Sequence, residues 1–184
     1  MPAVGIAHKN WLKGKAMGSK TMTDNLDLIH LKPTREWDLL PLFVQQSDPE
    51  ANVMAAFTVE DPNDQNAFIL KWTGVLNNPE ITMRSIFIAE TLVGSVLVYR
   101  MEGEPQLSYW IGKQWWGKGV ATQAVRLLLE TFTERPLFAS AAEDNVRSRA
   151  VLAKCGFQPV GTETGYANAR SAEITEVIYR LPGQ

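Results

Sequence analysis

The clearest pattern along the chain is a run of apolar, β-branched and aromatic residues in its middle third. Residues 82–90 (TMRSIFIAE) and 92–101 (LVGSVLVYRM) are separated by a short polar joint at Glu90–Thr91. This arrangement predicts an antiparallel β-hairpin. The turn EGE at 102–104 and the segment PQLSYWIG at 105–112 then predict a third strand of the same sheet.

Helical spacing replaces this strand pattern in the next segment. Between residues 119 and 132 the apolar positions fall on one face of a helix; they are Val120, Ala121, Ala124, Val125, Leu128, Leu129 and Phe132. PLFASAA at 136–142 predicts a strand after this crossover helix. NVRSRAVLAKCG at 145–156 predicts another helix, with Asn145 near its start and Gly156 as its C-terminal stop.

Strands are also expected at the two ends of the chain. LDLIHLKP (26–33) predicts a first strand that ends at its proline, and FQPVGTE (157–163) and EITEVIYRL (173–181) predict the last two.

Two helices are expected between the first strand and the hairpin. One covers 34–46, with Thr34 as its N-cap, and Pro41 weakens or kinks it. The other covers 66–76, after the turn-forming segment 59–65. The predicted order of elements is β-α-α-β-β-β-α-β-α-β-β. This order belongs to the α/β fold class, as a mixed sheet with helices on its faces.

Composition indicates one globular domain. The chain has 184 residues, 45% of them hydrophobic and 21% charged, which is typical of a soluble protein with a sizeable core. Residues 1–24 contain basic, Gly and Ser residues but no continuous apolar core of the length that a signal peptide needs. We expect them to be a flexible N-terminal arm or an over-long start of the reading frame, and residues 25–184 to form the domain.

Charge and cysteine content exclude several classes of function. The net charge is −2 and the pI is near 5.7, so nucleic acid is not an expected partner. No run of 18 apolar residues is present, so no membrane span is expected. Cys155 is the single cysteine, which excludes an internal disulfide and fits a reducing, cytoplasmic location. With only two histidines in addition, no metal cofactor is expected.

The segment QWWGKGVATQAV (114–125) carries the strongest candidate chemistry. Its glycines, Gly117 and Gly119, remove side chains where a helix is expected to begin. Several backbone N–H groups can therefore converge on one anion, which the helix dipole also favours. Gln114 and Lys118 add side-chain donors for phosphate oxygens. The Walker and G-x-G-x-x-G patterns are both absent, because Val-Ala-Thr follows Gly119.

The pattern Q-x-x-G-x-G at 114–119 resembles the acyl-CoA pyrophosphate loop of the GNAT superfamily of N-acetyltransferases. YWIG at 109–112 precedes the loop directly, and an N-x-x-S…K-x-G-F signature follows it, formed by Asn145, Ser148, Lys154, Gly156 and Phe157. Together these motifs are similar to the RimJ/RimL-like branch. The resemblance covers residues 26–182 and implies a GNAT-like acyl-CoA N-acyltransferase fold with acetyl-CoA as co-substrate.

The resemblance also implies roles for these residues. The third sheet strand and the strand after the long helix would splay apart and leave a slot for pantetheine. Backbone groups of Tyr109, Trp110, Ile111 and Gly112 would align the pantetheine arm and polarise the thioester carbonyl. The diphosphate would be held by the amides of Trp115, Trp116, Gly117, Lys118, Gly119, Val120 and Ala121. Asn145 would contact the cofactor from the other side, and Arg147 and Arg149 are candidates for its 3′-phosphate.

The proton donor departs from the pattern of many GNAT enzymes. Their acid is a tyrosine seven residues after the asparagine, and Leu152 occupies that position here. The RimJ/RimL-like branch offers a serine instead. We therefore expect Ser148 to protonate the leaving thiolate or to donate a hydrogen bond to it. The alternative is that Ser148 is only a polar residue in the first turns of a helix.

No general base stands out in the sequence. The candidates are Glu102, Glu104, Glu163 and Glu173, each of which is otherwise a solvated surface charge. Glu163 is favoured, because the loop at the end of its strand should border the acceptor cleft. A water held by backbone carbonyls, or an amine that binds in its neutral form, would make a carboxylate base unnecessary.

The function implied by the resemblance is transfer of an acetyl group from acetyl-CoA to a primary amine, by direct attack in a ternary complex. A protein N-terminus is the expected acceptor. The alternatives are a small amine, such as an aminoglycoside or a polyamine, and a non-catalytic acyl-CoA-binding module. Tyr166 and Arg170, in the loop expected at 164–172, are candidates for acceptor contacts. We expect a monomer or a homodimer.

Overall fold

The computed structural model describes residues 28–183, so the segment expected to be an arm, 1–24, lies outside the described residues. A seven-stranded sheet has the order β1-β2-β3-β4-β5-β7-β6. Its strands are β1 (Ile29–Pro33), β2 (Thr82–Ile88), β3 (Thr91–Met101), β4 (Glu104–Ile111), β5 (Leu137–Ala142), β6 (Gln158–Ala167) and β7 (Ala172–Leu181). Neighbouring strands are antiparallel except β4 and β5, which are parallel. The predicted mixed α/β fold is confirmed.

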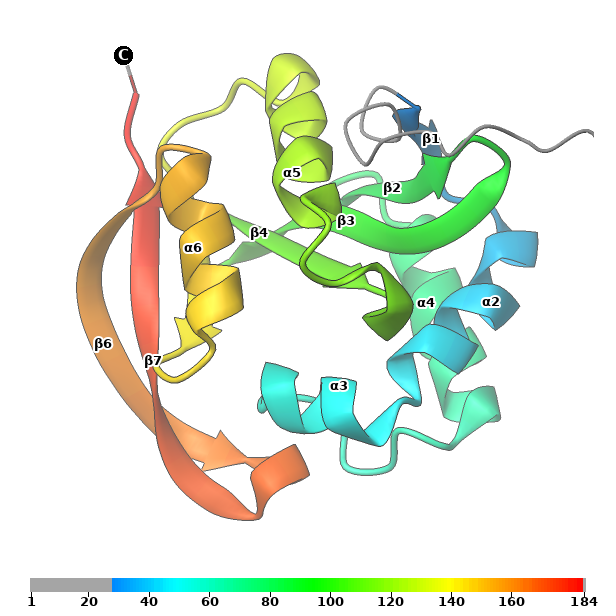
Figure 1. Ribbon diagram of the computed structural model, residues 1–184, viewed down its shortest axis with the longest axis horizontal. Coiled ribbons are helices and arrows are strands. Elements are labelled where there is room, and N and C mark those ends of the chain that lie inside the picture. Colours follow the sequence, from blue (N-terminus) through cyan, green and yellow to red (C-terminus); the bar gives the residue numbers. More distant parts are fainter. Residues whose placement is uncertain (1–27, 184) are drawn as a thin grey trace, which may run out of the picture.

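Helices cover both faces of this sheet. They are α2 (Leu39–Gln46), α3 (Pro49–Ala55), α4 (Gln65–Leu76), α5 (Val120–Thr131) and α6 (Val146–Lys154), with 3₁₀ turns η1 (Glu36–Asp38), η2 (Lys113–Trp115) and η3 (Asn168–Arg170). α5 and α6 pack on one face, α2 and α4 on the other, and α3 lies between α2 and the β6–β7 pair (Figure 1). None of the described helices is long and apolar enough to cross a membrane.

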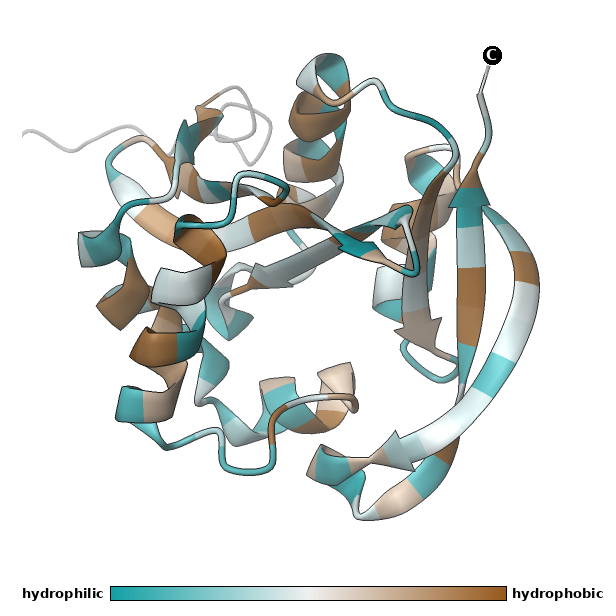
Figure 2. Cartoon of the chain, turned by 180° about the vertical axis from the view of Figure 1, so that it is seen from behind, coloured by the Kyte–Doolittle hydropathy of each residue, from teal (hydrophilic) through white to brown (hydrophobic). Residues whose placement is uncertain are grey.

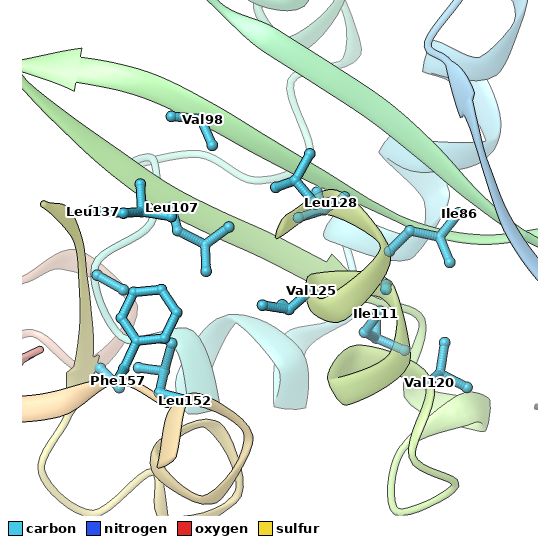
Figure 3. Packing of buried hydrophobic residues seen from close by; sticks show 14 of the residues in the cluster. Ile86, Val98, Leu107, Ile111, Val120, Val125, Leu128, Leu137, Leu152 and Phe157 are labelled. Carbon is cyan, nitrogen blue, oxygen red and sulfur yellow. The ribbon is translucent and has the colours of Figure 1, made fainter. Parts of the chain in front are cut away.

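The core explains why strand β3 is apolar on both of its faces over most of its length. Val96 and Val98 of β3 face the cluster that includes α5 and α6, whereas Leu97 faces the cluster with α2 and α4. A strand covered on both faces has no solvent side to carry polar residues. On the α5 side, Val125 and Leu128 pack against the sheet (Figure 3). By contrast, the outer strand β6 is coloured mostly as hydrophilic or neutral in Figure 2 and is exposed along most of its length.

The region between β1 and β2 differs from the expected pair of helices. α3 was not predicted, although Asp48 caps it by accepting a hydrogen bond from the Ala51 amide at 2.9 Å and Pro49 occupies its first turn. The predicted cap at Thr34 is wrong: the helix begins at Leu39, and the Thr34 hydroxyl accepts a hydrogen bond from Ser85 instead. Pro41 lies in the first turn of α2, where no intrahelical N–H bond is lost, so no kink follows.

The expected loop at 164–172 is largely regular structure. β6 continues to Ala167, η3 makes the turn, and β7 begins at Ala172. Arg170 donates to the carbonyl of Val53 at 2.7 Å and to the carboxylate of Asp144 at 2.6 Å. Its side chain therefore ties this hairpin to α3 and to the turn before α6.

Candidate active site

The site is built around the single parallel contact in the sheet. β4 and β5 pair only where Gln106 lies beside Phe138, and they diverge beyond it. A cavity of about 950 Å³ lies there, bounded by β4 from 106 to 111 and β5 from 138 to 142. The start of α5, one face of α6, α3, and parts of β6 and β7 complete its wall. This is the opening that the family resemblance implied, and its volume suits a small-molecule site.

The glycine loop presents unpaired backbone donors at one end of this cavity. Gly117 and Gly119 have φ values of 72° and 78°, in the left-handed region that glycine adopts without strain. The backbone bonds of the loop stop at Trp116 N–H to Lys113 O and resume at Gln123 N–H to Gly119 O. Within residues 28–183, the amides from 117 to 122 donate to no other protein group. A Cβ at Gly117 would meet nothing within 4 Å, so a bulky anion has room here.

The two tryptophans of the loop have different partners. Trp116 Nε1 donates to the Ile111 carbonyl at 2.8 Å, which fixes the loop to the end of β4. The Arg147 guanidinium lies 5.5 Å from the Trp116 ring centre, and the Lys118 ammonium lies 5.0 Å from that of Trp115. Trp115 Nε1 is buried and has no hydrogen-bond partner among the described residues. Both rings line the cavity.

Most of the residues predicted for cofactor binding meet at this cavity. Those that line it are Tyr109, Trp110, Ile111, Trp115, Trp116, Gly117, Gly119, Val120, Ala121, Asn145 and Ser148. Gly112, Gln114 and Lys118 do not line it. The Gln114 side chain lies against Gly112, and Lys118 is placed over the Trp115 ring. Arg147 and Lys154 add positive charge to the wall, whereas Arg149 donates to Tyr179 and lies outside it.

Asn145 joins the two sides of the site. Its Oδ1 accepts from the Ser148 amide at 3.1 Å, which caps α6, and its Nδ2 donates to the Met54 carbonyl of α3 at 3.1 Å. Both polar ends of the side chain are therefore bonded within the protein. Its structural role is to hold α6 against α3.

Ser148 and Tyr109 form a hydroxyl pair inside the cavity. Tyr109 Oη lies 2.7 Å from Ser148 Oγ and donates to the Ser148 carbonyl at 3.3 Å. Desolvation raises the pKa of Tyr109 to about 12, against a lowering effect of the Ser148 hydrogen bond. Leu152, at the position where many GNAT enzymes have tyrosine, is buried in the core beside Phe157 (Figure 3).

Four carboxylates also line the cavity. Glu102 and Glu104 line it from the β3–β4 turn, and Glu163 and Glu176 line it from β6 and β7, where they are directly opposite each other in the register. Glu163 is exposed and Glu176 is half-buried. Burial and the nearby Glu176 charge raise the pKa of Tyr99, which also lines the cavity.

Glu176 was missed in the sequence, and Glu173 does not line the cavity. The available signal was a charge within EITEVIYRL at the alternate position between Ile174 and Ile178. A charged residue between two apolar neighbours on one strand face is expensive unless it meets a cavity or a partner.

The remaining candidates for chemistry lie elsewhere. Cys155 is half-buried, its Sγ lies 3.6 Å from the Thr122 carbonyl, and burial raises the pKa of the thiol, so it is not an activated nucleophile. The described part of the chain contains no group of three or more His, Cys, Asp or Glu side chains placed to hold a metal ion.

A helix start lined with free amides and a sheet opened between two parallel strands fit an acyltransferase that takes a CoA thioester. The profile of the acetyltransferase (GNAT) domain family matches residues 29–158, and the chain belongs to this family. It is therefore an acetyl-CoA-dependent N-acetyltransferase.

Solved structures of acetyltransferases have the same fold. The microcin C7 self-immunity acetyltransferase MccE, solved with acetyl-CoA and AMP, superposes with a TM-score of 0.72 at 17% identity, over 85% of this chain and 93% of that one. The ribosomal alpha-N-protein acetyltransferase RimL gives 0.72 at 16% identity, over 84% and 90%. A GNAT-family acetyltransferase from Bacillus anthracis gives 0.67 at 15% identity, over 84% and 94%. No curated protein sequence matches this chain.

Proposed function

We propose that this enzyme acetylates a primary amine by direct attack in a ternary complex, with a protein N-terminus as acceptor, as the RimJ/RimL-like motifs imply. The observation that carries the proposal is one cavity that is lined both by groups that suit an anion and by groups that suit a cation. Free amides, Arg147 and Lys154 suit the diphosphate end of acetyl-CoA, and the four glutamates suit a cationic amine.

Each part of the cavity wall has its own role in binding acetyl-CoA and in the reaction. The amides from 117 to 122 hold the diphosphate, and the edge of β4 beyond Gln106 aligns the pantetheine arm, because no strand of the described chain pairs with it there. A β4 amide donates to the thioester carbonyl as it gains negative charge. Binding both substrates in one cavity replaces a slow bimolecular encounter by an intramolecular one.

We assign the base to Glu163, with Glu176 opposite it. Two facing carboxylates attract an ammonium ion, and one of them then accepts its proton before the amine attacks the thioester. Ser148 is the donor to the leaving thiolate, because it is the hydroxyl that α6 presents to the cavity next to β4. Ser148→Ala should therefore lower turnover without weakening acetyl-CoA binding.

An isosteric pair of variants tests the diphosphate site. Asn and Asp both tolerate the left-handed region, and position 117 has room for a side chain. Gly117→Asn adds bulk, and Gly117→Asp adds the same bulk with a negative charge. In calorimetric titrations, we expect Gly117→Asp to bind acetyl-CoA at least about tenfold more weakly than Gly117→Asn. A tenfold difference in affinity corresponds to about 1.4 kcal/mol, which the repulsion between the carboxylate and the diphosphate supplies. Equal affinities, or no binding to the wild type, would remove the basis of the proposal.

A small polyamine is the second candidate acceptor, favoured by the number of carboxylates that line the cavity. Release of free thiol from acetyl-CoA would be compared for peptides with a free N-terminus, the same peptides with a blocked N-terminus and a lysine, and spermidine. Faster release with free N-termini supports a protein acceptor. Thiol release with spermidine, and with none of the peptides, would identify a small amine as the acceptor.

A further inference from the structure

The Tyr109–Ser148 pair brings together two elements that are far apart in sequence. Tyr109 projects from β4 and Ser148 from the first turn of α6, and their hydroxyl oxygens are 2.7 Å apart. The Ser148 carbonyl also accepts from the Tyr109 hydroxyl, at 3.3 Å. The phenol has a single proton, and either hydroxyl can be the donor in the 2.7 Å contact. When the Tyr109 proton lies toward Ser148 Oγ, the Ser148 proton is left free to point elsewhere.

Both residues line the cavity, next to the strand edge that would carry the thioester. We propose that Tyr109 donates the hydrogen bond that keeps the Ser148 proton free for the leaving sulfur, so that the two hydroxyls act together as the hydrogen-bond donor to that sulfur. This inference rests on the proposed function, since it requires the CoA thioester in this cavity. Ser148 is the catalytic residue, and Tyr109 is a positioning residue that acts through it.

The proton transfers balance within one turnover. As the tetrahedral intermediate collapses, the C–S bond breaks and its electron pair goes to sulfur. The sulfur leaves as a thiolate that accepts the hydrogen bond of Ser148. A phenol whose pKa is raised to about 12 keeps its proton beside a thiolate whose free pKa is near 8.5. The thiolate takes its proton from solvent, which receives the one released by the acceptor nitrogen.

Tyr109 is suited to this role because it keeps its proton at neutral pH. Burial raises its pKa to about 12, and the nearby Cys155 and Tyr179 act in the same direction. The charged groups that line the cavity together with the pair are Arg147 and Lys154 of α6, Glu163 of β6, Glu176 of β7, and Glu102 and Glu104 at the β3–β4 turn. These charges act in the same way on a ligand with a sulfur atom and on one without it, so a comparison of two such ligands cancels their effect.

The test measures the thiol of bound CoA and needs no acceptor. CoA and desulfo-CoA, which lacks only the sulfur, would be titrated by calorimetry at several pH values between about 6.5 and 9.5, on either side of a free thiol pKa near 8.5. If the two hydroxyls donate to a thiolate, the affinity for CoA relative to desulfo-CoA should rise about tenfold across this range, which corresponds to a bound thiol pKa about one unit lower. The desulfo ligand cancels the titration of all other groups.

Tyr109→Phe keeps the ring and removes only the hydroxyl, and we expect the relative gain to fall below about threefold. Ser148→Ala should abolish it, and Tyr166→Phe, an exposed tyrosine outside the cavity, should keep it. Circular dichroism would establish that each variant is folded. A full gain in Tyr109→Phe, or no gain in the wild type while both ligands bind, would overturn the inference alone. Failure of the wild type to bind either ligand would instead overturn the proposed function, and the inference with it.

Discussion

At the scale of single residues, sequence was informative where a residue's own chemistry decides its place. Gly117 and Gly119 adopt positive φ, as a loop of this composition predicts, and Asn145 caps the helix that follows it. The Tyr109–Ser148 contact was not predictable, because its partners are 39 residues apart and meet only when α6 packs beside β4. Glu176 was missed for the same reason, since its importance depends on the cavity that it faces.

The raised pKa of Tyr109 has a consequence for stability in alkali. The unfolded chain ionises this tyrosine near 10.0 and the folded chain near 12. Its contribution to stability is therefore fully present below pH 10 and is lost as the pH rises through 12, because the unfolded state releases the proton first. The complete loss amounts to about 2.7 kcal/mol. Urea unfolding of the wild type and Tyr109→Phe at pH 9 and at pH 11.5 should show a smaller drop in the variant; equal drops would contradict the assignment.

The facing glutamates predict opposite effects on stability and activity. Like charges directly across an antiparallel pair are destabilising, so Glu176→Gln should raise the free energy of unfolding by about 0.2 to 1 kcal/mol. The same change removes a charge that we propose holds the ammonium, so kcat/KM for the acceptor should fall about tenfold or more. Glu173→Gln, on the same strand but outside the cavity, is the matched control and should change neither. If the Glu176→Gln enzyme kept its full kcat/KM, Glu176 would have no role in acceptor binding.

At the scale of elements, the sequence predicted the helices and strands that have a long periodic pattern of apolar residues. It missed the short helix whose only signals are the residues at its N-terminal end. α5 and the β2–β3 hairpin carry long apolar patterns and were correctly placed. α3 spans only seven residues, and its evidence in the sequence is a cap and a proline rather than a period. The β6–β7 hairpin extends beyond its predicted strands, because Arg170 stabilises a turn that composition alone marks as a loop.

Asn145 both caps α6 and bonds to α3, so its variant can be compared with that of Asp64, which only caps α4. Asn145→Ala removes the cap of α6 and its bond to α3, which should cost about 1 to 2 kcal/mol of stability and also weaken acetyl-CoA binding. Asp64→Ala removes the cap of α4, whose carboxylate accepts from the Ala67 amide at 2.9 Å and lies outside the cavity. It should cost a similar stability with unchanged affinity. Denaturant unfolding and calorimetry on both variants would measure this, and equal affinities would show that Asn145 acts only as a cap.

At the scale of the whole molecule, the ligand should stabilise the fold. Acetyl-CoA at about 100 times its Kd adds about 2.7 kcal/mol to the free energy of unfolding. For a domain of this size, that corresponds to a rise in Tm of about 5 to 10 °C. Differential scanning fluorimetry should show this shift for the wild type and for Gly117→Asn, and a smaller one for Gly117→Asp. A Tm independent of acetyl-CoA would argue against a bound state of this kind.

The divergence of β4 from β5 also has a consequence for solubility. A continuous sheet has two free edges, whereas a sheet that opens beyond one pair of residues has two more, facing each other across the gap. Exposed strand edges with unpaired backbone groups are templates for aggregation. When the pantetheine arm fills the gap, it covers these inner edges. We therefore expect the enzyme depleted of acetyl-CoA to be the aggregation-prone form, so that its lifetime in solution depends on the supply of its own co-substrate.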